Sequence, residues 1–149
     1  MNLSLAPRPA LGTTALRLAV GIVFTAHGAQ KLFQMTPAGV AGFFEQIGIP
    51  LPLANAYLVI ALELLGGLAL IAGLGTRVLA ALLAAVMGVA FATVHASHGF
   101  FLPNGYEFVL VMFAASVTLV FQGAGAFALD NLVSERAPGA PAASAAARA

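Results

Sequence analysis

Four long apolar stretches dominate the pattern of hydrophobic and polar positions along the chain. They cover residues 14–33, 53–73, 77–95 and 106–122, and short connections rich in glycine, proline or polar residues separate them. A hydrocarbon core about 30 Å thick needs roughly 20 helical residues to cross it. Because a helix satisfies its own backbone hydrogen bonds within lipid, the pattern predicts four transmembrane helices.

A shorter element is predicted between the first two stretches, in the segment TPAGVAGFFEQIGIPLP. Thr36 followed by Pro37 is a helix-start signal, with an N-cap and then proline in the first turn. The apolar positions that follow share one side of this helix: Val40, Phe43, Phe44 and Ile47. A helix this short lies in the interface or re-enters from it. The predicted fold class is therefore all-α, a transmembrane four-helix bundle with a short interfacial or re-entrant helix between the first and second spans.

The composition agrees with an integral membrane protein. Apolar residues make up 61% of the chain and charged residues 7%, against roughly 25% charged in soluble domains, and the mean hydropathy is +1.01. A net charge of +1 gives no basic surface for nucleic acid. Cysteine is absent, which excludes disulfides, cysteine-ligated zinc, iron–sulfur clusters and c-type haem, so any thiol chemistry must belong to a partner.

The pattern divides the chain into three parts. We expect an N-terminal cytoplasmic segment at 1–13, a membrane domain at 14–130, and a disordered tail rich in alanine and proline at 131–149. The first apolar stretch could also be read as a signal peptide, but it continues as HGAQKLF and lacks a small-residue cleavage site.

The distribution of basic residues predicts the orientation. Five arginines fall on the side of the two termini, and Lys31 falls on the other: Arg8, Arg17, Arg77, Arg136 and Arg148. By the positive-inside rule, both termini are predicted to be cytoplasmic, with Arg17 and Arg77 as anchors at the helix ends.

Five titratable side chains are predicted to share the outer half of the bundle: His27, Lys31, Glu63, His95 and Glu107. Glu63 lies about 15 Å into the second span, near the bilayer midplane. An ionisable group there costs a few kcal/mol, about 2.5–3.5 at the helix centre, unless it has a partner or a cavity.

Small residues mark the faces along which membrane helices approach one another. They share the helix faces of three titratable groups: Gly66 and Gly67 with Glu63; Ala84, Gly88 and Ala92 with His95; Ala114 and Thr118 with Glu107. Glu63, His95 and Glu107 are therefore predicted to point into the bundle. His27 and Lys31 are predicted to face Glu63, with Lys31 reaching inward or extending to the interface.

These residues leave several chemistries open. A histidine and a desolvated carboxylate suit proton transfer near pH 7, which favours His27 and Glu63 as catalytic residues. A structural role is the alternative, in which Glu63 fixes helix register through a buried ion pair. His27 and His95 could ligate a b-type haem, or join Glu63 and Glu107 at a metal, but their spacing matches no ligand motif and we predict neither. An ion-coupled carrier is a further alternative.

Four motifs in order, HGAQKLF, FFEQIGIP, ALELLGGLALIAGLGTR and NGYEF, resemble the DoxX family over about residues 14–130. The resemblance implies a small four-helix protein of a bacterial-type inner cell membrane. It also implies a relation to the DoxD subunit of thiosulfate:quinone oxidoreductase. Six residues fall on the motif positions: His27, Gln30, Lys31, Glu63, Asn104 and Glu107.

Together these observations predict a membrane subunit of a quinone-linked oxidoreductase system. The predicted ligand-binding residues are His27, Gln30, Lys31, Glu63, His95, Asn104 and Glu107. A quinone is the candidate ligand, no resident cofactor is assigned, and a soluble redox protein or a second copy of the chain are the candidate partners. The alternative is a non-catalytic membrane module that carries a solute, binds lipid or docks a partner.

Overall fold

The fold was analysed in a computed structural model that describes residues 9–135. Helices and tighter or wider helical turns form its regular structure, and there is no strand within 9–135. In chain order the elements are α1 (Pro9–Gln30), η1 (Lys31–Met35), α2 (Pro37–Gln46), α3 (Pro52–Ala61), η2 (Leu62–Gly66), α4 (Gly67–Ala72), α5 (Thr76–Ala90), η3 (Phe91–His95), η4 (Ala96–His98), α6 (Glu107–Gln122) and α7 (Leu129–Glu135). The first three η elements are π-helical turns, and η4 is a 3₁₀ turn.

Three continuous helical runs within 9–135 are long and apolar enough to cross a membrane: Ala10–Met35, Pro52–Ala72 and Thr76–His98. The fourth predicted span is α6, a shorter apolar helix of 16 residues, or about 24 Å. The predicted all-α membrane bundle is therefore confirmed. α1 begins at Pro9, before the predicted start of the first span at residue 14.

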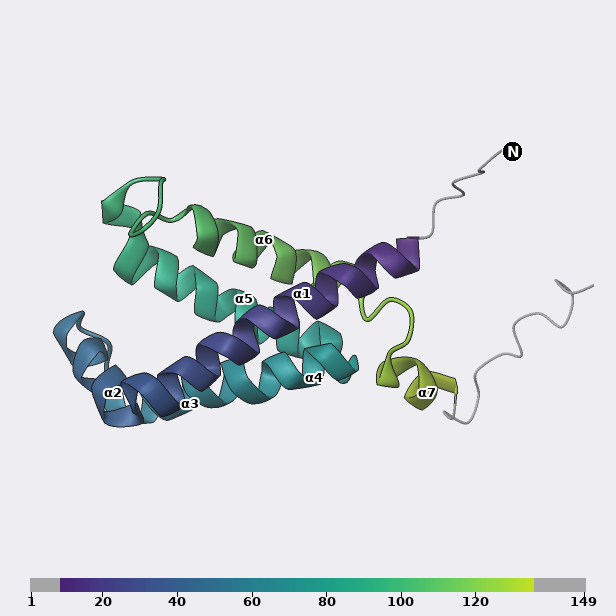
Figure 1. The fold of residues 1–149 in the computed structure, drawn as a ribbon, viewed down its shortest axis with the longest axis horizontal. Helices are drawn as coiled ribbons and strands as arrows, with labels where there is room; N and C mark the ends of the chain where they lie inside the picture. The colour runs from purple at the N-terminus through teal and green to yellow at the C-terminus, as the bar shows by residue number, and fades with distance from the viewer. Residues whose placement is uncertain (1–8, 136–149) are drawn as a thin grey trace, which may run out of the picture.

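The bundle consists of two helical layers that diverge (Figure 1). α1 lies along the run formed by α3, η2 and α4, and α5 lies beside α6. We call the end where α1 begins and α6 finishes the termini end, and the opposite end, with α2 and the 99–106 loop, the far end. In Figure 1 the two layers meet toward the termini end and separate toward the far end, so α2 and the 99–106 loop lie apart.

The helices that meet do so through large apolar side chains and close backbone contacts. Phe24, Leu70, Leu83 and Leu119 come from four different spans and are buried in one cluster. Where α1 crosses η2, a Cβ atom on Gly28 would overlap the backbone of Leu64. Glycine is therefore required at this crossing, as it is where other membrane helices approach closely.

Gly28→Ala is expected to lower the free energy of unfolding by about 1–3 kcal/mol, because the added methyl group overpacks the crossing. The matched control is Gly12→Ala on the same helix, where no atom lies within 4 Å of the added Cβ. That change should leave stability unchanged or raise it by up to about 1 kcal/mol, through helix propensity. Thermal and denaturant unfolding in detergent measures both. Equal effects of the two changes would contradict the close approach of α1 and η2.

The short helix predicted after the first span is α2, and it packs on α3. The Thr36 hydroxyl accepts a hydrogen bond from the N–H of Gly39 at 3.3 Å, as expected of an N-cap. Val40 and Phe44 are buried against α3, but Phe43 is 38% exposed. The contact with α3 therefore covers a narrower stripe than the predicted apolar side, which also includes Phe43.

Arg17 lies at the centre of a polar cluster at the termini end. Its side chain is 1% exposed, and its Nε donates to the carbonyl of Ala124 at 2.8 Å. Its Nη1 donates to Ile71 at 2.7 Å and also to Leu70. Arg17 was predicted as an anchor at the helix end, but the early start of α1 places it two turns inside the helix, facing backbone carbonyls.

Arg17 fixes the strap, which we define as residues 123–128 between α6 and α7. Just beyond the strap, the Asp130 carboxylate accepts hydrogen bonds from the backbone N–H groups of Gly75 (2.7 Å) and Thr76 (2.9 Å) at the start of α5. Burial raises the pKa of Asp130, but these hydrogen bonds and the charge of Arg17 outweigh it and hold the pKa below its ordinary value. The stabilisation is therefore present above the ordinary carboxyl pKa and lost as pH falls through the lowered one.

The predicted N-terminal segment at 1–13 and the predicted tail at 131–149 are only partly described by the structure. α7 crosses the predicted boundary at residue 130, and the apolar pattern gave no indication of this helix. The predicted disorder of 136–149, and the arginines at 8, 136 and 148 that favour cytoplasmic termini, lie outside the described residues. The orientation therefore stays a prediction.

Candidate functional site

A buried ion pair joins the first and second spans in the far half of the bundle. Lys31 Nζ lies 2.6 Å from Glu63 Oε2, and the Glu63 side chain is 2% exposed while that of Lys31 is 21% exposed. Lys31 begins η1 at the end of α1, and Glu63 lies in η2 at the middle of the second span. The predicted contact between these residues is present, with Lys31 reaching inward.

His27 lies one helical turn before Lys31 and is partly buried. It is close enough to Lys31 and Glu63 to interact with both charges. Its ring also packs against that of Phe108 at the start of α6, with centroids 5.8 Å apart. His27 therefore links the ion pair to the second helical layer. Gln30 is exposed, and the described residues give it no side-chain hydrogen bond.

The other three predicted residues gather around the 99–106 loop. His95 Nδ1 lies 2.9 Å from the backbone carbonyl of Asn104, and Glu107 Oε1 accepts a hydrogen bond from Leu102 N at 2.8 Å. These contacts fix the loop to the ends of the third and fourth spans. The far end thus holds two groups of predicted site residues, one around Glu63 and one around the loop, and the His27–Phe108 contact connects their helices.

The structure corrects two of the predicted helix faces. Ala114, predicted to share an inward face with Glu107, is exposed. The buried stripe of α6 instead follows Val109, Met112, Ser116 and Leu119. Glu107 therefore turns back to the loop, where an unpaired backbone N–H needs an acceptor. Ala92 is also exposed, because the π turn η3 shifts the phase of the face that Ala84 and Gly88 begin.

Three of the four titratable site residues predicted on the first three spans lie in π-helical turns, and the fourth, His27, lies in α1. Lys31 opens η1, Glu63 is the second residue of η2, and His95 closes η3. A π turn holds one residue more than an α turn, and such turns are frequent at functional sites. Periodicity analysis gave no sign of them, because it assumes a constant α-helical pitch.

No three histidine, aspartate or glutamate side chains come together as metal ligands within the described part of the chain. What the site offers is one buried carboxylate, one ammonium group and one imidazole in apolar surroundings. The ammonium group and the imidazole can donate hydrogen bonds, the carboxylate accepts them, and all three groups can exchange protons.

Comparison with known proteins gives the family. The DoxX family profile matches residues 12–96, more than half of the chain. The chain belongs to the DoxX family. A Bacillus subtilis (strain 168) relative named "Putative oxidoreductase CatD" is 36% identical over 123 residues, which cover 83% of this chain and 87% of the relative. An uncharacterized Haemophilus influenzae protein is 34% identical over 120 residues, 78% of this DoxX chain and 86% of the relative. No solved structure matches the chain.

Proposed function

We propose that this DoxX-family chain is a membrane subunit of a quinone-linked oxidoreductase system and binds the quinone head group near Lys31 and Glu63. The observation that carries the proposal is the 2.6 Å ion pair beside His27, with its carboxylate buried, in the far half of an apolar bundle. Ionisable groups at this depth are costly and are functional by default. The word oxidoreductase in the name of the Bacillus subtilis relative is in line with it.

The residues present fit the chemistry of a quinone. Quinone carbonyl oxygens accept hydrogen bonds, and Lys31 Nζ keeps two N–H donors beyond the one directed at Glu63. Reduction of a quinone to the quinol takes two electrons and two protons. Glu63 and His27 are groups that can hold and pass those protons. The chain has no cysteine, so a soluble redox partner would supply or accept the electrons.

The runner-up is a non-catalytic membrane module that carries a solute, binds lipid or docks a partner. The observation that favours it is that Lys31 and Glu63 already satisfy one another, as a pair that only fixes helix register would. The quinone-linked function requires that Glu63 can ionise, whereas a non-catalytic module requires only that Glu63 holds the two helices in register.

Glu63→Gln tests the proposal, because glutamine keeps the shape and one oxygen acceptor for Lys31 but cannot ionise. Binding of a short-chain benzoquinone or naphthoquinone to the detergent-solubilised protein is expected to weaken at least about tenfold, the equivalent of one lost charge-assisted interaction. Thermal stability should fall only slightly. Glu45→Gln is the matched control, since Glu45 is an exposed acid on α2 at the same end.

The result that contradicts the quinone proposal is unchanged quinone binding in Glu63→Gln. Loss of stability and binding together in Glu63→Gln, with no effect in Glu45→Gln, would favour the register-fixing role instead.

A further inference from the structure

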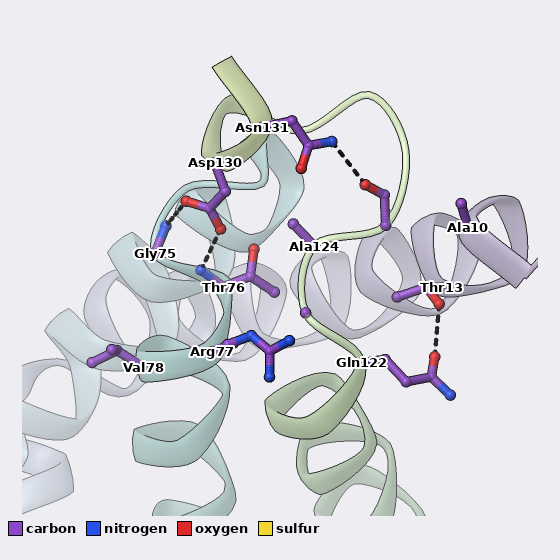
Figure 2. A pocket seen from close by; sticks show the side chains of 12 residues that line it. Ala10, Thr13, Gly75, Thr76, Arg77, Val78, Gln122, Ala124, Asp130 and Asn131 are labelled. Carbon is purple, nitrogen blue, oxygen red and sulfur yellow. Dashed lines mark hydrogen bonds between the residues drawn. The ribbon is translucent and has the colours of Figure 1, made fainter. Parts of the chain in front are cut away.

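A cleft of about 840 Å³ opens at the termini end, between the start of α5, the end of α6 and the strap (Figure 2). It lies at the opposite end of the bundle from Lys31 and Glu63, so the proposed function makes no use of it. Among the residues that the structure describes, two charged side chains line it, Arg77 and Asp130. Their roles differ. Both oxygens of Asp130 accept hydrogen bonds from the protein backbone, whereas Arg77 uses only one of its nitrogens in such bonds.

The Asp130 carboxylate already accepts hydrogen bonds from the protein backbone. Figure 2 shows its two oxygens turned to the start of α5, where each accepts one of the backbone N–H bonds described above. The partial positive charge of the helix N-terminus and the nearby Arg17 balance its negative charge. An anion entering the cleft therefore meets a carboxylate that is already compensated.

Arg77 leaves half of its guanidinium group available. Its Nη1 donates to the carbonyls of Val120 (2.7 Å) and Phe121 (2.9 Å), which fixes the group at the end of α6. Its Nε and Nη2 have no acceptor among the residues that the structure describes. These adjacent donors form the edge of a guanidinium that binds two oxygens of a phosphate or carboxylate at once.

Gly123 keeps this edge of Arg77 uncovered. A Cβ atom at this position would lie 3.2 Å from Nη2 and 3.3 Å from Nε of Arg77. Its φ of +81° is also a conformation that residues with a side chain rarely adopt. Next to it, Gln122 accepts a hydrogen bond from Thr13 through Oε1, at 2.7 Å, and its amide nitrogen remains as a further donor.

The cleft continues onto an apolar surface that faces outward. Val78 lines it and is 67% exposed, and Leu82, one turn deeper on the same face of α5, is 43% exposed. α5 begins at Thr76, so Arg77 lies at the boundary of the membrane-spanning run and Leu82 lies within it. A cationic group at the boundary with apolar side chains below it matches the two halves of a phospholipid.

We propose that this cleft binds an anionic phospholipid, with Arg77 Nε and Nη2 donating to two oxygens of its phosphate group and an acyl chain lying along Val78 and Leu82. Nothing in this inference depends on the function proposed for Lys31 and Glu63. A soluble phosphate ester has the same head-group chemistry, but it would gain nothing from the apolar surface of α5. The two sources therefore differ in a measurable way.

The test measures binding of phosphatidylglycerol to the full chain in mild detergent by native mass spectrometry. The wild-type protein should retain one lipid per chain. Arg77→Gln should weaken binding at least about tenfold, through loss of the charge-assisted pair. Gln122→Glu should weaken it several-fold by adding a negative charge to the cleft, while glutamate keeps the oxygen that accepts from Thr13. Gln46→Glu adds the same charge at the exposed end of α2 and should have no effect.

Competition separates the two sources of phosphate. Inorganic phosphate and glycerol phosphate at millimolar concentration should not displace the lipid. Displacement by either would overturn the lipid assignment in favour of a soluble phosphate ester. Wild-type affinity in both Arg77→Gln and Gln122→Glu would refute the site itself. Equal weakening in Gln122→Glu and Gln46→Glu would also refute it, because binding would then follow overall charge.

Discussion

Arg17→Met is expected to lower the free energy of unfolding by about 3–5 kcal/mol, because it removes several charge-assisted hydrogen bonds from a buried site at once. The Arg17 side chain is 1% exposed and donates to carbonyls at the end of α4 and in the strap. Its Nη2 adds a longer contact to Phe127, at 3.3 Å. Methionine fills much of the same volume, so the loss measures the unpaired carbonyls more than a cavity.

Two further variants separate geometry from charge. Arg17→Lys keeps the charge, but a single ammonium group cannot reach both α4 and the strap, so most of the loss should remain. Arg77→Met removes carbonyl contacts from an exposed arginine, where water replaces them, and should cost less than about 1 kcal/mol. Denaturant unfolding in detergent measures all three. A loss in Arg17→Met no larger than that in Arg77→Met would contradict the role assigned to Arg17.

Lys31→Met is expected to destabilise the protein by a similar amount, about 3–5 kcal/mol, because it leaves the Glu63 carboxylate buried without a partner. Unfolding of Lys31→Met in detergent measures this.

Glu63→Leu and the double variant complete the thermodynamic cycle. Glu63→Leu should cost less than Lys31→Met, because Lys31 is partly exposed and can turn toward the interface. The double variant Lys31→Met/Glu63→Leu should regain most of the stability, as buried ion pairs replaced by packed apolar groups often do. Additive losses across the cycle would show that the 2.6 Å contact contributes no coupling between the two residues.

The helices themselves could be predicted because hydrophobic length is a direct requirement of the bilayer. All four apolar stretches are helices, and Pro37 marks a helix start as expected. α7 was missed because it is short and polar, and it is held by contacts such as that of Asp130 with α5. Such long-range contacts leave no periodic signal in the sequence.

Part of the candidate site could be predicted from the cost of burying charge. A carboxylate in the middle of a span needs a partner, and His27 and Lys31 were the groups predicted to face Glu63. The structure shows that Lys31 makes the ion pair. Glu107 does not point into the bundle as predicted, because its carboxylate accepts a hydrogen bond from the backbone N–H of Leu102 in an irregular loop. The role of Arg17 was missed because basic residues near helix ends were read by the positive-inside rule, which does not consider backbone carbonyls as partners.

The π turns change the helical phase, that is, the direction in which side chains point before and after each turn. Each turn of an α-helix takes 3.6 residues, so one extra residue in η1, η2 or η3 rotates everything beyond it by about 100°. η2 lies between α3 and α4, so the two halves of the second span have different helical phases. A single-residue insertion or deletion within η2 would rotate α3 relative to α4. Such a change would alter which side chains of α3 lie near the ion pair and would leave the termini end, where Arg17 binds the strap, unchanged.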